Sequence, residues 1–170
     1  REGIADYEDL QCYMIDKVEA YLASKGRKLA GWDEVTRNNL EKGALVYSYR
    51  GQNYTSESAN KGQNVVFTPG AALSFDWYQD TPDTQPVAMI GYTPLRKVYE
   101  MEPLAVDPLV ALRNEEFILG KKLDGGVDFI KPENVSNLVG VQGCAWSEFI
   151  NDSQHLEYMI FPRALAISEL

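Results

Sequence analysis

The chain has 170 residues, of which 45% are hydrophobic, which is enough for one domain with a real core and too apolar for a disordered segment. Its net charge of −9 argues against nucleic-acid backbones and anionic membranes as partners, and no apolar run reaches membrane-spanning length. One histidine and two widely spaced cysteines argue against a His-based zinc site or a Ser-His-Asp triad, so we expect no metal and no cofactor.

The first half of the chain reads as helices and strands in alternation. Asp6 to Ser24 carries apolar residues at helical spacing, and Lys25-Gly26 supplies a stop, so a helix is predicted there. Short apolar runs predict strands at Arg27 to Trp32, Ala44 to Tyr49 and Asn64 to Phe67. Brief helical segments are predicted through Leu40 to Lys42 and at Glu57 to Lys61.

The second half loses this rhythm. Thr81 to Pro86 is a turn-rich connector, and Thr93-Pro94 predicts the start of a helix that runs to about Tyr99. Residues 103–131 are mixed in character. A fourth strand is predicted at Asn137 to Cys144, and a final helix at Ser153 to Leu170 that Pro162 interrupts.

Alternating strands and helices with continuous apolar strands predict an α/β fold with a parallel sheet. The fold class that we expect is half of a (β/α)8 TIM barrel, because a full barrel needs roughly 250 residues. The chain also begins without Met, so we expect it to be a piece of a longer protein. Open sheet edges predict that the half-barrel associates with itself or with the missing half.

The stretch Gly140-Val-Gln-Gly-Cys-Ala-Trp-Ser-Glu148 ends a predicted buried strand with an aromatic ring and a carboxylate. Residues at i and i+2 of an extended segment point the same way, so Trp146 and Glu148 are predicted to face one ligand. A flat ring beside a carboxylate suits a sugar, since the ring stacks on C–H groups and the acid accepts hydroxyl hydrogen bonds. The alternative is a core tryptophan followed by an acid at a helix N-terminus.

Several motifs occur together and in one order along nearly the whole chain. They are Gly31-Trp-Asp-Glu-Val35, Thr68-Pro69 through Phe75-Asp76-Trp77-Tyr78-Gln79, Tyr92-Thr-Pro-Leu95, Gly140 to Glu148, and Pro162-Arg-Ala-Leu-Ala166. In this arrangement the chain resembles the C-terminal half of the catalytic barrel of glycoside hydrolase family 20, the β-N-acetylhexosaminidases. It is similar to the enzymes of gut Bacteroidetes that trim glycans. The resemblance implies strands 5–8 of the barrel over residues 1–170.

The resemblance implies an exo-acting glycosidase that releases terminal N-acetylhexosamine from glycans by substrate-assisted retention. In that mechanism the acetamide oxygen of the substrate attacks the anomeric carbon, an Asp orients the acetamide, and the adjacent Glu is the general acid. The family carries this pair in a His-x-Gly-Gly-Asp-Glu motif that is absent from these 170 residues. We therefore expect no catalytic residue in this chain, and we read Asp33-Glu34 as hydrogen-bonding or helix-capping acids.

The resemblance assigns sugar-binding positions to Trp32, Tyr49, Asp76, Trp146 and Glu148. The tryptophans would form walls of the sugar pocket, and the two acids would hold ring hydroxyls. The chain departs from the family pattern at two positions.

The family usually has Tyr where this chain has Ser74, and Trp where this chain has Tyr49. The rival hypothesis is a non-catalytic carbohydrate-binding module, and these two departures favour it. The resemblance also implies a periplasmic or secreted location. Arg163 is predicted to be structural and to pair with an acid.

Overall fold

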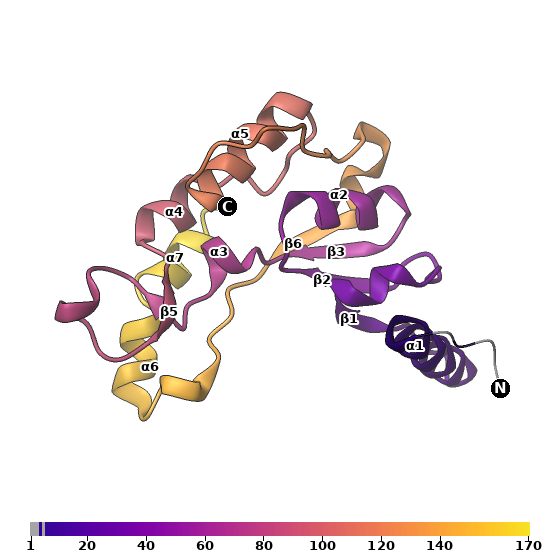
Figure 1. Ribbon diagram of the computed structural model, residues 1–170, viewed down its shortest axis with the longest axis horizontal. Helices are drawn as coiled ribbons and strands as arrows, with labels where there is room; N and C mark the ends of the chain where they lie inside the picture. The colour runs from indigo at the N-terminus through magenta and orange to yellow at the C-terminus, as the bar shows by residue number, and fades with distance from the viewer. Residues whose placement is uncertain (1–3, 5) are drawn as a thin grey trace.

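A computed structural model describes residue 4 and residues 6–170 (Figure 1). Its α-helices are α1 (Tyr7–Ser24), α2 (Gln52–Asn60), α3 (Gly70–Leu73), α4 (Leu95–Glu100), α5 (Pro108–Leu119), α6 (Ser153–Ile160) and α7 (Arg163–Ile167). Its strands are β1 (Ala30–Trp32), β2 (Leu45–Ser48), β3 (Asn64–Phe67), β4 (Trp77–Tyr78), β5 (Met89–Tyr92) and β6 (Leu138–Val141). Short 3-10 helices are η1 (Asp33–Arg37), η2 (Pro82–Thr84), η3 (Pro132–Asn137) and η4 (Ser147–Phe149).

Four strands form one sheet in the order β1-β2-β3-β6, and every neighbouring pair is parallel. Val46, Val65 and Phe67 are fully buried, which is why these segments read as apolar runs. Helix α2 connects β2 to β3, and α1 lies beside β1 at one side of the sheet (Figure 1). The predicted α/β class with a parallel sheet is confirmed, and all carboxyl ends of these strands face one edge.

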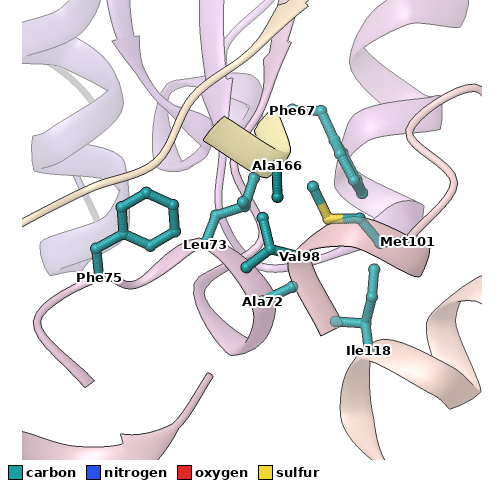
Figure 2. Close-up of a cluster of buried hydrophobic side chains, with 8 residues drawn as sticks. All are labelled: Phe67, Ala72, Leu73, Phe75, Val98, Met101, Ile118 and Ala166. Carbon is teal, nitrogen blue, oxygen red and sulfur yellow. The ribbon is translucent and has the colours of Figure 1, made fainter. Parts of the chain in front are cut away.

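The second region contains the other helices and the small parallel pair β4-β5, and it lies at the far side of β6 from α1 (Figure 1). Its core is a cluster of buried apolar side chains that also includes the last residue of β3 (Figure 2). The members are Phe67, Ala72, Leu73, Phe75, Val98, Met101, Ile118 and Ala166. The sheet and the helical region are thus joined through one continuous apolar contact.

Three predicted helix positions were wrong in detail. The segment Leu40 to Lys42 is not helical; the helical turn after β1 is η1, which begins directly at Asp33. Helix α2 starts at Gln52, five residues before the predicted Glu57, because Gly51 supplies the turn at φ 109°. Thr93 does not cap α4; it is fully buried, and the helix begins at Leu95.

The mixed segment 103–131 contains a helix that the sequence analysis did not predict. Asp107 caps α5 by accepting hydrogen bonds from the backbone N–H groups of Leu109 and Val110, and Pro108 holds the first helical position. An Asp-Pro pair before an apolar run is a helix-start signal, so this element could have been found.

The C-terminal helix is interrupted as predicted. Helix α6 ends at Ile160, the Phe161–Pro162 peptide bond is cis, and α7 begins at Arg163. No helix in the described part of the chain is long and apolar enough to cross a membrane.

Candidate functional site

A cavity of about 250 Å³ opens at the carboxyl ends of the parallel strands. Its walls come from the last residue of β1 and from the segments that follow β2, β3 and β6. The lining residues are Trp32, Glu34, Tyr49, Thr68, Gly70, Ser74, Cys144 and Trp146. The structure therefore brings together three of the predicted sugar-binding residues, Trp32, Tyr49 and Trp146.

Aromatic rings form one side of this cavity. The ring centroids of Trp32 and Trp146 are 5.7 Å apart with a tilt of 46°. Tyr49 meets Trp32 edge to face at 5.9 Å, and Tyr47 packs on the same indole at 5.5 Å. Trp146 keeps 49% of its surface exposed, so its ring is available to a ligand rather than enclosed in the core. Such a surface can stack against the apolar face of a sugar ring.

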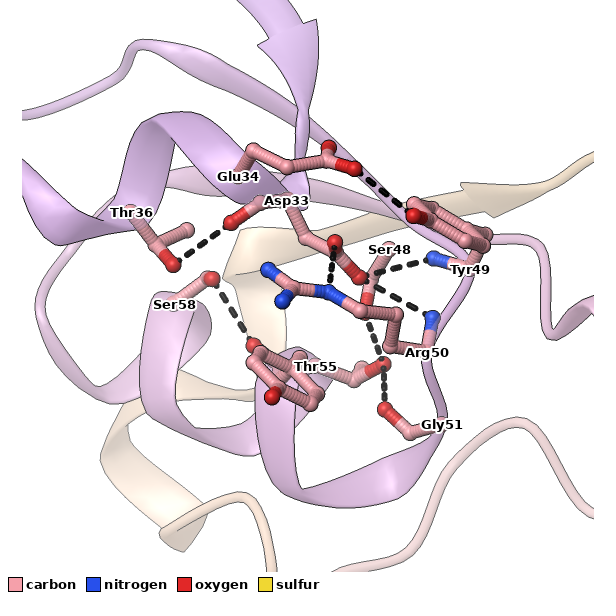
Figure 3. Close-up of polar contacts among 10 residues, drawn as sticks. Asp33, Glu34, Thr36, Ser48, Tyr49, Arg50, Gly51, Thr55 and Ser58 are labelled. Carbon is pink, nitrogen blue, oxygen red and sulfur yellow. Dashed lines mark hydrogen bonds and ion pairs between the residues drawn. The ribbon is translucent and has the colours of Figure 1, made fainter. Parts of the chain in front are cut away.

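An ion pair between Asp33 and Arg50 supports the segment that carries Tyr49, on the aromatic side of the cavity (Figure 3). The Asp33 side chain is fully buried, and its Oδ1 accepts a hydrogen bond from Arg50 Nε at 2.6 Å. Its Oδ2 accepts from the backbone N–H groups of Tyr49 and Arg50, each at 3.0 Å. All three N–H groups donate to the same carboxylate, so Asp33 fixes the backbone at Tyr49 and Arg50. The expectation that this acid serves in hydrogen bonding is confirmed.

Glu34 turns the other way and lines the cavity. The Tyr49 hydroxyl donates a 2.6 Å hydrogen bond to Glu34 Oε1 (Figure 3). That hydrogen bond, reinforced by burial and by the Glu34 charge, raises the pKa of Tyr49 to about 12. Tyr49 is therefore a neutral donor at all ordinary pH values. The sequence analysis did not predict Glu34 as a pocket residue, although its position after Trp32 and Asp33 placed it beside them.

Small polar groups form the opposite side of the cavity. The Oγ1 of Thr68 lies 3.3 Å from the Sγ of Cys144, and Ser74 pairs with Cys144 through an isolated parallel bridge. The fourth strand was predicted to run as far as Cys144. That prediction was wrong, because β6 ends at Val141 and the half-buried thiol lines the cavity.

Asp76 lies just beyond the cavity, between β4 and the segment that carries Trp146. It is only 5% exposed, and its Oδ1 has no hydrogen-bond partner among the described residues. Burial raises the pKa of Asp76, and the nearby charge of Glu148 adds to that rise. Hydrogen bonds from the backbone N–H of Asp76 itself and from that of Trp146 oppose this rise in pKa. Asp76 thus ties the Trp146 backbone in place and retains one free acceptor oxygen.

Glu148 does not share an extended face with Trp146. The chain is extended at Trp146 and then turns into η4, so Glu148 is exposed and is not part of the cavity wall. The i and i+2 argument was wrong here because it requires a continuous strand. Glu148 nevertheless acts electrostatically on Asp76, so the two acids lie close together.

Arg163 is fully buried and holds the Asp76 side of the site. Its guanidinium donates to the backbone carbonyls of Phe75 at 2.6 Å, Thr93 at 3.0 Å and Trp77 at 3.2 Å, and also to Met159. Burial lowers the pKa of Arg163 to about 10, which leaves it charged at neutral pH. The predicted pairing with an acid was wrong, since these donors go to carbonyl oxygens.

The carbonyls of Phe75 and Trp77 flank Asp76, so Arg163 fixes the segment that presents this acid. No group of three or more His, Cys, Asp or Glu side chains suited to a metal occurs in the part of the chain that the structure describes. The lining residues can therefore stack on a ligand and can accept and donate hydrogen bonds, and Glu34 is the one carboxylate among the described residues that line the cavity.

A parallel sheet with an aromatic cavity at the carboxyl ends of its strands defines an α/β protein, and the cavity lies in the position that active sites take in barrel enzymes. All 170 residues match the model of the glycosyl hydrolase family 20 catalytic domain, and the chain belongs to that family.

The relatives of this chain are bacterial hexosaminidases. A beta-hexosaminidase of Porphyromonas gingivalis is 32% identical over 169 residues, which is 99% of this chain and 19% of that protein. A beta-hexosaminidase of Vibrio furnissii is 28% identical over 98% of this chain and 24% of its own length.

Among solved structures, a GH20 exo beta-N-acetylglucosaminidase from Vibrio harveyi in complex with N-acetylglucosamine superposes with a TM-score of 0.75. It is 30% identical over 98% of this chain and 23% of that chain. The chain therefore spans about a fifth to a quarter of the length of these relatives.

Proposed function

We propose that this chain supplies the sugar-binding walls of an exo-acting β-N-acetylhexosaminidase that releases terminal N-acetylhexosamine from glycans. The observation that carries the proposal is the cavity between Trp32, Tyr49 and Trp146, in a chain whose whole length matches the family. Its volume of about 250 Å³ suits a single sugar ring with a small substituent, as an exo-acting enzyme requires.

In this proposal residues 1–170 form the C-terminal half of the catalytic domain and a partial (β/α)8 barrel. Four parallel strands with a site at their carboxyl ends support it, because a closed barrel uses the same edge. Strand β1 at one side and β6 at the other each have a neighbour on one side only, so further strands can pair there. The missing half-barrel, or a second copy of the chain, is the proposed partner.

The roles follow from the positions of the side chains. Trp32 and Trp146 stack on the sugar, and Tyr49 closes the cavity beside them. Asp76 and Glu148 hold ring hydroxyls, and the free Oδ1 of Asp76 supports that role. These contacts position the sugar for substrate-assisted attack by its own acetamide oxygen.

The chain does not supply the catalytic pair in this proposal. Asp33 is fully buried and already accepts from Arg50 and from two backbone N–H groups, so it has no role as an acetamide-orienting acid. The catalytic Asp-Glu pair then lies upstream in the parent protein, which we place in the periplasm or outside the cell.

The second candidate function is a non-catalytic carbohydrate-binding module. The short side chain of Ser74 and the phenol of Tyr49 line the cavity where the family pattern has Tyr and Trp, and these departures favour it. The encoding gene separates the two candidates, since an upstream Gly-Gly-Asp-Glu motif supports the enzyme and its absence supports the binder.

Sugar binding by the 170-residue chain tests the shared part of both candidates. We expect saturable NMR shifts on titration with methyl N-acetyl-β-glucosaminide, with loss of binding in Trp32→Ala and Trp146→Ala. Tyr21→Ala on the exposed face of α1 is the matched control and should bind normally. An aryl N-acetyl-β-glucosaminide should not be hydrolysed by the chain alone. Hydrolysis that disappears in Asp33→Ala or Glu34→Ala would contradict the assignment of an upstream catalytic pair.

A further inference from the structure

The segment from Tyr49 to Gln52 joins β2 to α2 and carries one wall residue of the cavity. Two buried carboxylates hold its backbone. Asp33 accepts hydrogen bonds from the N–H groups of Tyr49 and Arg50, each at 3.0 Å. Glu115 of α5 accepts from the N–H of Gln52 at 3.1 Å. The segment is therefore fixed at both of its ends by acids that come from other parts of the chain.

Glu115 takes the place of a helix cap that α2 lacks. The residue before α2 is Gly51, which has no side chain to accept a hydrogen bond. Helices α1, α5 and α6 each have a capping aspartate from their own sequence. In α2 the carboxylate comes instead from a residue that lies 63 positions along the chain from Gln52. A carboxylate is stabilised at the N-terminus of a helix by the free N–H groups there and by the helix dipole.

The contact between Glu115 and the segment is close enough to exclude a side chain at Gly51. A Cβ atom on Gly51 would collide with Glu115 Oε1, and the φ of Gly51 is 109°, so glycine is required there. Glu115 is only 8% exposed, and no Lys or Arg of the described chain lies within ion-pair distance of it. The hydrogen bond from Gln52 therefore holds this carboxylate against the segment.

Helix α5 is firmly attached to the helical region, so Glu115 has a fixed support. Ile118, three residues after Glu115, belongs to the buried apolar cluster of that region (Figure 2). Asn114, the preceding residue, is 5% exposed and exchanges two hydrogen bonds of 2.7 Å with the backbone of Glu102. The segment is thus held from the helical region by Glu115 and from the sheet by Asp33.

The side chain of Arg50 links α2 to the Asp33 contact. Its guanidinium carbon lies 3.9 Å from the centroid of the Tyr54 ring, in the first turn of α2, and its Nε donates to Asp33. A shift of this turn therefore disturbs the Asp33 contact. Tyr49, whose N–H donates to the same carboxylate, moves with it.

From these contacts we propose that Glu115 is a positioning residue of the cavity, which sets the place of Tyr49 beside Trp32 by holding the segment 49–52 between the sheet and α5. Its effect on sugar binding rests on the proposed function, because that effect requires a sugar in the cavity. Its effect on the segment does not, since Glu115 is not among the residues that line the cavity. The two effects can therefore be measured separately.

Amide hydrogen exchange of the 170-residue chain, followed by NMR, measures the effect on the segment without a ligand. Glu115→Met keeps the volume of the side chain and removes the acceptor. We expect exchange about tenfold faster at Gln52, Tyr49 and Arg50, which corresponds to the loss of one hydrogen bond to a charged group. Exchange at Val46 within β2 should not change. Acceleration at Gln52 alone would reduce Glu115 to a helix cap and overturn the inference.

Titration with methyl N-acetyl-β-glucosaminide measures the effect on the cavity. We expect Glu115→Met to raise the Kd about three- to tenfold, because a wall residue that keeps its place only roughly a third to a tenth of the time weakens binding by that factor. Glu115→Gln retains an acceptor oxygen for the N–H of Gln52 and should recover most of the affinity. In a Tyr49→Ala background, Glu115→Met should cause no further loss, since Glu115 acts through Tyr49.

Two further variants complete the design. Gly51→Ala breaks the same contact from the other side and should reproduce the effects of Glu115→Met, also if that variant does not fold. Glu157→Met, on the exposed surface of α6, is the matched control and should change neither the exchange of the segment nor the affinity.

The outcomes separate the two proposals. If the wild type binds the sugar and Glu115→Met binds it equally well, this inference is overturned and the proposed function stays in place. A loss of the same size in the Tyr49→Ala background also overturns it, since Glu115 then acts by another route. Failure of the wild type to bind the sugar overturns the proposed function, and with it the role of Glu115 in binding, whatever the exchange rates are.

Discussion

Two buried charged side chains, Asp33 and Arg163, order the backbone around the cavity, and their charges are of opposite sign. We call the segments that they order the β1-β2 corner and the β4-α7 corner. At the β1-β2 corner an acid, Asp33, gathers the N–H groups of Tyr49 and Arg50. At the β4-α7 corner a base, Arg163, gathers carbonyl oxygens that include that of Phe75. Each buried charge thus organises backbone rather than ligand, and each leaves the neighbouring side chains free to face the cavity.

The corners differ in how their charge is balanced. Asp33 has a counter-ion in contact. The guanidinium of Arg163 donates only to neutral carbonyls and lies over the Phe75 ring, and the Asp76 charge acts on it without an ion pair. The Asp33 side chain is fully buried, but its partner Arg50 keeps 27% of its side chain exposed to water. The first corner can therefore rehydrate when it is broken, and the second cannot. This difference predicts unequal costs for disrupting them.

The largest effect is expected for Arg163→Met, which keeps the volume and removes every donor. Buried carbonyls of Phe75, Trp77 and Thr93 lose their partner, so unfolding free energy should fall by about 3 kcal/mol or more. Urea denaturation gives the value. Arg163→Lys should recover less than half, because an ammonium cannot reproduce the planar fork.

Arg113, exposed on α5, provides the control for that measurement. Arg113→Met should change stability by no more than about 0.5 kcal/mol. An Arg163→Met protein as stable as this control would show that the carbonyls find other donors, and the comparison between the corners would fail.

A smaller loss is expected for Asp33→Asn. The amide retains one acceptor oxygen, yet Arg50 loses its counter-ion and one N–H loses its acceptor. We expect about 2 kcal/mol of destabilisation by urea denaturation, below the cost at Arg163 because water reaches Arg50. Glu34→Gln removes the same charge from the neighbouring residue and should lower the unfolding free energy by about 0.5 kcal/mol or less. If the two variants lost the same unfolding free energy, the burial of Asp33 would make no measurable contribution to stability.

The smallest effect concerns Asp76 and appears as a dependence on pH. Its pKa is raised above the ordinary value of 3.8, mainly by burial, so the folded protein binds this proton more tightly than the unfolded chain does. The contribution of Asp76 to stability is therefore fully present below pH 3.8 and is lost as pH rises through the folded-state pKa.

Asp76→Asn should abolish that loss. The stability of the wild type relative to Asp76→Asn is expected to fall as pH increases from 3.8 through the mildly acidic range, measured by denaturation at a series of pH values. A difference that rises with pH would reverse the sign and would indicate that the positive charge of Arg163 dominates over burial.

The sheet could be predicted from sequence because buried parallel strands consist of continuous apolar residues bounded by turn residues. The runs around Val46 and Val65 needed no tertiary information. The β4-β5 pair could not be predicted in this way. Strand β4 has only two residues and Trp77 is half-buried, so no apolar run marks it. The apolar residues Val87 to Ile90 lead into β5, but a single short run does not reveal that its partner is β4.

The site was predictable most directly at residues that end a strand. Trp32 closes β1 and Tyr49 follows β2 directly, so both reach the expected edge of the sheet. Glu148 does not line the cavity, because η4 ends the extended segment directly after Trp146. The contacts of Arg163 with Phe75 and Thr93 join segments far apart in sequence, and no local pattern reveals such a contact.

The contact between Trp32 and Trp146 has an optical consequence. Two indole chromophores 5.7 Å apart and tilted by 46° couple their electronic transitions, and coupled transitions give a paired positive and negative band in circular dichroism. The two indoles come from β1 and from the segment after β6, so the band exists only while both segments are docked. The intact cavity therefore carries its own spectroscopic signature, which disappears when either side opens.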